Sequence, residues 1–252
     1  MHSEKQYIDL YRECREQICA HSAAPLNAVR DAAFEQFERQ GFPSRKVERY
    51  KYTSVDELFA PDYGVNVNRL EIPVDPYKAF RCDVPNLSTS LYFIVNDQFR
   101  AALQPKENLP EGVVVDSLAA YAQANPQFVA DHYAQLAHAD EDGITALNTM
   151  LAQDGLLVYV KRGVKVDRTI QVINILRSDV PLMVNRRVLI VMAEGAEAKL
   201  LFCDHAADDR EFLATQVIEA YVGRNASLDL YCMEETHYKN TRVSNVYIEQ
   251  QA

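Results

Sequence analysis

The sequence predicts an α-rich first half followed by a second half built from short, repeating β-strands. Three segments in residues 146–247 carry the prediction for the second half, because each alternates apolar and polar residues with the two-residue period of a half-buried strand. Each segment begins with a residue that tolerates a positive φ, namely Gly163, Gly195 or Asn225. An apolar run that is typical of a further strand precedes each one, at residues 156–160, 188–192 and 217–222.

The three segments align as a repeat. Superposing Val164, Ala196 and Ala226 gives offsets of 32 and 30 residues, which is typical of solenoids and other repeat proteins. In a coiled chain each rung stacks on the one before, because no rung can bury its apolar row alone. The rows predicted to point inward are Val164 and Val166; Ala196, Ala198, Leu200 and Phe202; and Ala226, Leu228, Leu230 and Cys232. An antiparallel meander or sandwich also gives short alternating strands, so periodicity alone leaves both architectures open.

The first half is predicted to be mainly helical, and we divide the chain into domains 1–145 and 146–252. Gly41 is placed to end a helix, the Ser54–Glu57 segment has the spacing of a capping box, and Asn96-Asp97 between two apolar runs predicts a hairpin. The predicted helices span residues 4–20, 25–41, 117–124, 126–137 and 140–153, the predicted strands span 91–95, 98–103 and 112–115, and the proline-rich residues 60–90 are expected to be irregular.

Composition excludes several classes of partner. The net charge of −10 argues against an extended phosphate-binding face, so no nucleic-acid partner is expected. No run of ~18 apolar residues is present, so no membrane partner is expected. The start of the chain, Met1–Gln6, lacks the pattern of a signal peptide, which predicts a cytoplasmic protein. The odd number of widely spaced cysteines indicates reduced thiols. These are Cys14, Cys19, Cys82, Cys203 and Cys232.

One segment is both basic and aromatic. Residues 41–53 contain four cations interleaved with tyrosines, which are Arg45, Lys46, Arg49 and Lys51. The favoured interpretation is a solvated face, on which the tyrosine side chains lie between the charged groups. The alternative is a contact surface for an anion or a partner protein.

The sequence contains no nucleotide-binding loop, no nucleophile elbow and no zinc-protease motif. Cys203 and His205 are the candidate metal ligands, since soft and borderline ligands close together suit iron or zinc. The repeat alignment places Cys232 inward as a small buried residue and Cys203 outward, so the two thiols cannot share an ion. Residues 204–210 are expected to form a solvated loop. We therefore predict no catalytic, cofactor-binding or metal-binding residue in this chain.

Two segments resemble the SufB/SufD family of iron–sulfur cluster assembly proteins. Pro43-Ser44-Arg45-Lys46-Val47-Glu48-Arg49-Tyr50-Lys51-Tyr52-Thr53 is similar to a segment near the N-terminus of SufD-type members, although Tyr50 stands where Trp is usual. Ala146–Val160, followed by Lys161-Arg162-Gly163-Val164, resembles the start of the family's β-helix. The segments 188–195 and 221–230 resemble later rungs. The helical hairpin before Pro43 fits the SufD side better than the SufB side.

The resemblance implies a right-handed parallel β-helix, here incomplete, behind an N-terminal α+β helical domain. It implies a non-enzymatic scaffold of the SUF system that pairs with a SufB-like paralogue and a SufC-like ABC ATPase. The Fe–S cluster would then belong to the complex and ATP to the SufC partner, with neither bound by this chain alone. Family members are typically longer. The remaining rungs, the cluster-site His and the SufC-docking helices are therefore expected beyond Ala252.

Two other functions stay open. A β-helix enzyme acting on polysaccharide would need clustered outward carboxylates or basic residues along one strand face, whereas Lys165, Glu197, Lys199, Ser227 and Asp229 are mixed in sign. The second alternative is a structural interaction solenoid with no link to iron.

Overall fold

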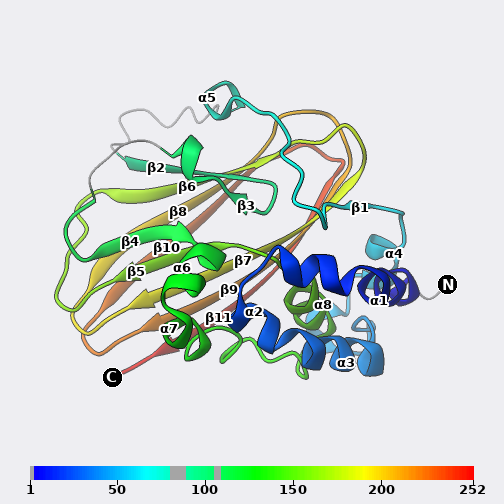
Figure 1. Ribbon diagram of the computed structural model, residues 1–252, viewed down its shortest axis with the longest axis horizontal. Helices are drawn as coiled ribbons and strands as arrows, with labels where there is room; N and C mark the ends of the chain where they lie inside the picture. Colours follow the sequence, from blue (N-terminus) through cyan, green and yellow to red (C-terminus); the bar gives the residue numbers. More distant parts are fainter. Residues whose placement is uncertain (1–2, 80–88, 105–108) are drawn as a thin grey trace.

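The computed structural model describes residues 3–79, 89–104 and 109–252, so Cys82 lies outside the described residues. Two β-sheets run through the molecule, and most of the helices gather against one of them (Figure 1). One sheet has the strand order β11-β9-β7-β5-β4 and the other β10-β8-β6-β2-β3. We call them sheet A and sheet B.

The second half of the chain is a parallel β-solenoid of about 3 turns, as the resemblance implied. The chain alternates between the sheets, so each turn adds one strand to each. Glu197 pairs with Ser227 and Leu182 with Phe212, thirty residues apart in both cases. This parallel register excludes the meander and the antiparallel sandwich. The strands are β5 (Leu156–Val160), β6 (Thr169–Leu176), β7 (Leu182–Met192), β8 (Glu197–Ala206), β9 (Phe212–Val222), β10 (Ser227–Glu235) and β11 (Asn240–Gln250).

The main apolar core lies between the two sheets. The predicted inward rows contribute to it, with Ala198, Leu200 and Phe202 buried and Leu228 and Leu230 packed against it. Facing residues from sheet A include Val188, Ile190 and Met192. Stacked rows of this kind bury apolar surface only when neighbouring rungs are present. The core is therefore shared by all turns of the solenoid.

Tight turns between rungs need a left-handed backbone. Gly163 and Gly195 have φ values of 71° and 70°, and Asn225 has 56°. Gly adopts this region without steric cost, and Asn tolerates it better than other residues with a Cβ. The three residues that set the repeat in the sequence thus share one backbone conformation.

The first half contributes strands to the same sheets. The predicted hairpin is present, with Asn96 at φ 58° in its turn, and its first strand pairs in parallel with β6. Its second strand is shorter than the predicted 98–103, because it ends at Phe99 and residues 101–103 form a 3₁₀ turn. A two-residue strand within the region expected to be irregular pairs with β7. These strands are β1 (Gly64–Val65), β2 (Thr89–Val95), β3 (Gln98–Phe99) and β4 (Val113–Ser117).

Most helices cover the outer face of sheet A. The predicted helices 126–137 and 140–153 are shorter than expected. The helix starting near Pro25 is interrupted at Val29 and ends at Gln40, before Gly41. Residues 131–137 do not continue the helix that starts at Pro126. The helices are α1 (Glu4–Ala20), α2 (Ala24–Ala28), α3 (Arg30–Gln40), α4 (Val55–Phe59), α5 (Pro76–Ala79), α6 (Leu118–Ala124), α7 (Pro126–Ala130) and α8 (Gly143–Leu151), with 3₁₀ turns at Glu48–Tyr50 and Ala101–Leu103.

Helix α8 joins the helical layer to the solenoid and is buried along its whole length. Ile144, Leu147 and Met150 pack in one cluster with residues of α1, α3, β7 and β9. Asp142 caps its N-terminus by accepting hydrogen bonds from the backbone N–H groups of Ile144 and Thr145. Among the helices of the described ranges, none combines the length and the hydrophobicity that a membrane-spanning helix needs.

Candidate functional site

The basic and aromatic segment forms an exposed loop, which we call the basic loop (residues 43–53). Arg45 donates a hydrogen bond to Ser54 Oγ at 2.9 Å, which replaces the predicted capping box, because the Ser54 side chain makes no capping bond to α4. Arg49 lies 3.4 Å from Asp142, and Lys51 lies 4.0 Å from Glu48. The exposure of the loop fits a solvated face and a contact surface equally well, so its role as a contact surface stays a prediction.

Tyr50 anchors the basic loop to the body of the protein. Its hydroxyl donates a hydrogen bond of 2.7 Å to Asp142 Oδ2 in a buried position. Burial, reinforced by Asp142, raises the pKa of this hydroxyl, so it stays protonated as the donor. Asn245 of β11 donates to the other oxygen of Asp142 at 3.1 Å. One carboxylate therefore joins the basic loop, the start of α8 and the strand β11.

Cys203 and Cys232 point to opposite faces of sheet B, as the repeat predicted. Cys232 pairs in register with Phe202 of the core, and Cys203 pairs with Met233 on the outer face. The expectation that Cys232 is buried is wrong, since its rung is an edge of the sheet and leaves the thiol exposed. Cys203 is buried in a cluster on the outer face of sheet B, against which Val74 and Ala79 of the preceding segment pack.

The expectation of a solvated loop at residues 204–210 is also wrong for residues 204–206, which belong to a strand. Strand β8 continues to Ala206, and both Asp204 and His205 are buried. His205 lines a pocket of about 620 Å³ together with Glu235, His237 and Asp208.

The His205 Nδ1 atom lies 3.4 Å from Glu235. Burial lowers the pKa of His205 against the opposing effect of Glu235 and Asp204, so the imidazole is neutral at neutral pH. Across residues 3–79, 89–104 and 109–252, no group of three or more His, Cys, Asp or Glu side chains is placed to hold a metal ion.

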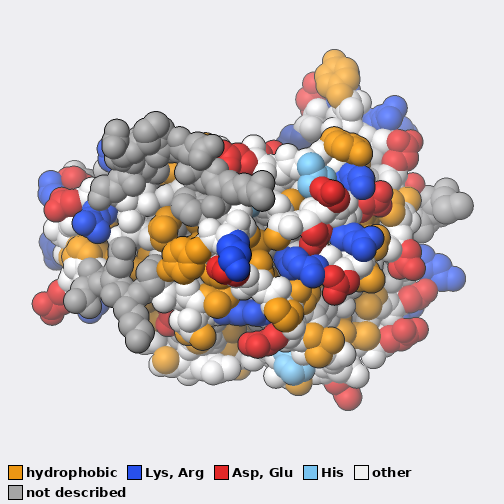
Figure 2. Space-filling model, turned by 90° about the horizontal axis from the view of Figure 1, so that it is seen from above, with side chains coloured by type: hydrophobic (Ala, Val, Ile, Leu, Met, Phe, Trp, Pro, Cys, Tyr) orange, Lys and Arg blue, Asp and Glu red, His pale blue; other side chains and the backbone are white. Residues whose placement is uncertain are grey.

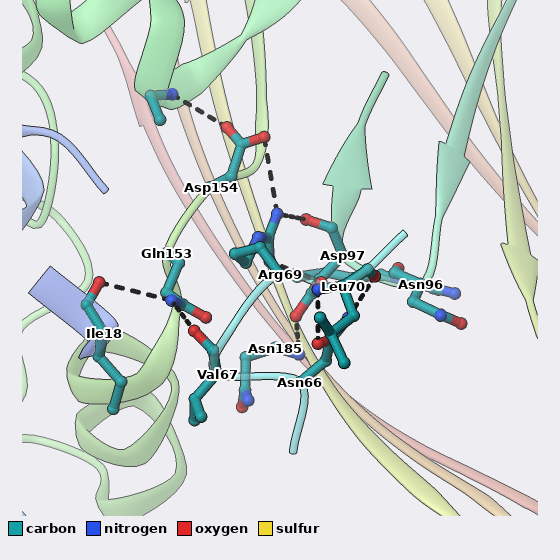
Figure 3. Close-up of polar contacts among 12 residues, drawn as sticks. Ile18, Asn66, Val67, Arg69, Leu70, Asn96, Asp97, Gln153, Asp154 and Asn185 are labelled. Carbon is teal, nitrogen blue, oxygen red and sulfur yellow. Dashed lines mark hydrogen bonds and ion pairs between the residues drawn. The ribbon is translucent and has the colours of Figure 1, made fainter. Parts of the chain in front are cut away.

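A partly buried ionic junction joins the helical region to the solenoid. Arg69, whose φ is 54°, donates to Asp97 at 2.7 Å and lies 3.8 Å from Asp154 (Figure 3). Asp154 also accepts hydrogen bonds from the Ser117 hydroxyl and the backbone N–H of Ala119. Burial raises the pKa of Asp154, while Arg69 and these donors oppose that shift. The junction fixes the segment around Arg69 against the hairpin turn.

The ionic contacts continue inside the solenoid. Arg186 donates its Nε hydrogen to the carbonyl oxygen of Asn96, at the same hairpin turn, and pairs with Asp204 across the interior. Asp204 also accepts from Arg242 of β11 at 3.0 Å, and Arg242 pairs with Glu234 of β10. A row of paired charges thus extends from the hairpin turn to β10 and β11, and apolar clusters lie on both sides of this row. Each buried ion in this row is paired, as desolvation requires.

A second buried ion pair fastens the outer face of sheet A. Arg187 lies 2.5 Å from Glu219, and both side chains are fully buried. Glu219 also accepts hydrogen bonds from the backbone N–H groups of Ala134, Leu136 and Ala137. Burial alone would raise the pKa of Glu219, but Arg187 and the three donors hold it below its ordinary value. These contacts explain why residues 134–137 lie on the sheet and not in a helix.

Sequence patterns did not reveal these buried charges. Arg69, Asp97 and Asp154 lie in turns and loops, where charged residues are normally solvated. Arg186 and Arg187 interrupt a strand at positions that period-2 patterning assigns to opposite faces of one sheet. A charged pair in the middle of an apolar strand was the available signal, because it demands buried partners.

The surface shows mixed charge. Figure 2 shows acidic, basic and apolar side chains intermingled on one face. On the outward row of the solenoid, Lys165 pairs with Glu197 at 2.6 Å and Lys199 with Asp229 at 3.5 Å. These pairs form ladders across neighbouring rungs. The carboxylates of this row are neutralised by lysines, which does not suit acid–base hydrolysis of a sugar.

Comparison with known families gives two matches that cover nearly the whole chain. Residues 1–172 match a family model described as the SufBD protein N-terminal region. Residues 174–252 match a model described as the SUF system FeS cluster assembly, SufBD core domain. No curated protein matches the sequence.

Proposed function

The chain belongs to the SufBD family of the SUF system for iron–sulfur cluster assembly, and we propose that it acts there as a SufD-type scaffold subunit that catalyses no reaction itself. The observation that carries the proposal is the pair of family matches, one over residues 1–172 and one over residues 174–252. The solenoid supports it, because stacked rungs present a long, rigid surface suited to holding other proteins.

The proposed partners are a SufB-like paralogue and a SufC-like ABC ATPase. In this arrangement the Fe–S cluster is cargo that is built and handed on by the complex, and ATP is bound and hydrolysed by the SufC-like subunit. The SufD-type assignment is supported by the α1–α3 hairpin that precedes the basic loop. We also propose that the chain carries out this scaffold function in the cytoplasm.

The residues of this chain support a positioning role. Several of its buried or half-buried charges are engaged in pairs that join structural elements, such as Arg187 with Glu219 and Arg69 with Asp97. We therefore assign these groups to holding the scaffold rigid and not to proton transfer.

Complex formation tests the proposal. The chain is mixed with the SufB-like and SufC-like proteins of the same organism and examined by native mass spectrometry. We expect an assembly that contains all three proteins. A matched control is Gly155→Val, because a Cβ at Gly155 would lie 2.1 Å from the Arg187 carbonyl oxygen and disrupt the first rung. Assembly of the SufB-like and SufC-like proteins while this chain stays free would contradict the scaffold role.

A further inference from the structure

The basic loop (residues 43–53) has a charge that its surroundings leave uncompensated. Arg49 and Lys51 face the carboxylates of Asp142 and Glu48. Arg45 hydrogen-bonds only to the neutral hydroxyl of Ser54 among its described contacts, and Lys46 has no ion pair within the described residues. Two adjacent positive charges are thus exposed on a chain of net charge −10. This local reversal of sign favours an acidic ligand.

A pocket of mixed lining lies beside these two charges. It has a volume of about 320 Å³, and its lining includes the apolar side chains of Phe42, Pro43 and Val47 as well as the charged groups of Arg49, Glu141 and Asp142. Val47 is 40 % exposed, and Tyr52 on the same loop is 90 % exposed. Exposed aromatic and aliphatic groups next to cations are typical of protein-binding sites. The pocket can take an apolar side chain while the cations face carboxylates.

The basic loop is held in one conformation before any ligand binds. Tyr50 is only 8 % exposed and donates its hydroxyl hydrogen to Asp142. Successive backbone hydrogen bonds run from Val47 N–H to the Ser44 carbonyl at 3.0 Å, from Tyr50 to Val47 at 2.9 Å and from Thr53 to Tyr50 at 2.9 Å. A pre-ordered loop loses little conformational entropy on binding, which favours its use as a recognition surface.

We propose that the basic loop docks an acidic segment of a partner protein that also carries an apolar side chain. The carboxylates of that segment lie against Arg45 and Lys46, and its apolar side chain enters the pocket formed by Phe42, Pro43 and Val47. Tyr52 packs over the bound segment. The charges cover only a short loop, which fits a peptide better than the extended phosphate backbone of a nucleic acid. The inference does not depend on the proposed role in cluster assembly.

Random-peptide phage display on the whole chain tests the proposal. We expect the enriched sequences to be acidic and to contain at least one large apolar residue. A synthetic, fluorescein-labelled copy of the best sequence is then titrated by fluorescence anisotropy. We expect the double variant Arg45→Glu/Lys46→Glu to weaken binding by roughly tenfold or more, because like charges then face each other. Added salt should also weaken binding, since the contacts are exposed.

A matched control reverses two exposed cations of the solenoid, Lys161→Glu/Arg168→Glu, and should leave the affinity within about twofold. All these side chains are exposed, so an unchanged Tm shows that each variant is folded. Three results would overturn the proposal. They are enrichment without acidic character, equal binding by the Arg45/Lys46 double variant, and tighter binding of phosphatidylserine vesicles or single-stranded DNA than of the peptide.

Discussion

The buried pair Arg187–Glu219 gives the sharpest prediction for the stability of the solenoid. Both side chains are fully buried, 2.5 Å apart, so removing either one leaves an uncompensated charge in a dry environment. Breaking such a pair from one side costs about 3–5 kcal/mol. For a chain of this size that cost corresponds to a fall in Tm of roughly 6–20 °C. We expect this loss for Arg187→Met and for Glu219→Gln.

The double variant Arg187→Met/Glu219→Gln separates charge pairing from packing. With both charges gone, the side-chain carbonyl oxygen of the introduced glutamine can still accept hydrogen bonds from the loop N–H groups that Glu219 now holds. We therefore expect the double variant to lose much less than the sum of the two single losses, which is the signature of coupled residues. Urea unfolding followed by circular dichroism measures all three variants. Additive losses, or single losses below about 1 kcal/mol, would refute the reasoning.

Three further perturbations follow from other contacts. Lowering the pH from about 7 to about 5 should destabilise the wild type more than the His205→Gln variant. Burial keeps His205 neutral in the folded protein, whereas the imidazole of the unfolded chain gains a proton near pH 6.5. Equal pH profiles of stability for the two proteins would rule out this role of His205. Tyr50→Phe should lower the free energy of unfolding by about 1–3 kcal/mol in urea titrations, because buried Asp142 loses a donor, and no change would show that the bond is not stabilising. Gly195→Val should lower the free energy of unfolding by about 1–2 kcal/mol, because residue 195 has a φ of 70°, whereas Asn225→Gly should be neutral or stabilising. A Gly195→Val variant more stable than Asn225→Gly in thermal unfolding would contradict the turn assignment.

The repeat could be predicted because its causes are local. Gly163, Gly195 and Asn225 mark turns that need a left-handed backbone, and each following strand alternates with the pleat. The direction of the strands could not be predicted from the pattern, because parallel and antiparallel pairing give the same alternation. Parallel pairing was implied only by the family resemblance, and the registers of β7 with β9 and of β8 with β10 confirm it.

The environment of single residues was harder to predict. Asp204 and His205 follow the apolar run of β8 and have the composition of a loop, but partners on other strands bury them. Arg242 lies nearly forty residues beyond Asp204 and reaches it only through the coil of the chain. Cys232 follows the inward pattern, yet it is exposed because no rung covers its strand in this structure. Patterns within one strand assign its faces and do not reveal what lies against them.

The most direct measurement of the scaffold role is delivery of an Fe–S cluster to an apo-ferredoxin. The SufB-like and SufC-like proteins are supplied with iron, a sulfur source and ATP, with or without this chain, and the transferred cluster is followed by visible circular dichroism. We expect that adding the chain accelerates delivery, and that the Gly155→Val variant in its place does not. Delivery at the same rate in all three mixtures would contradict a scaffold role for this protein.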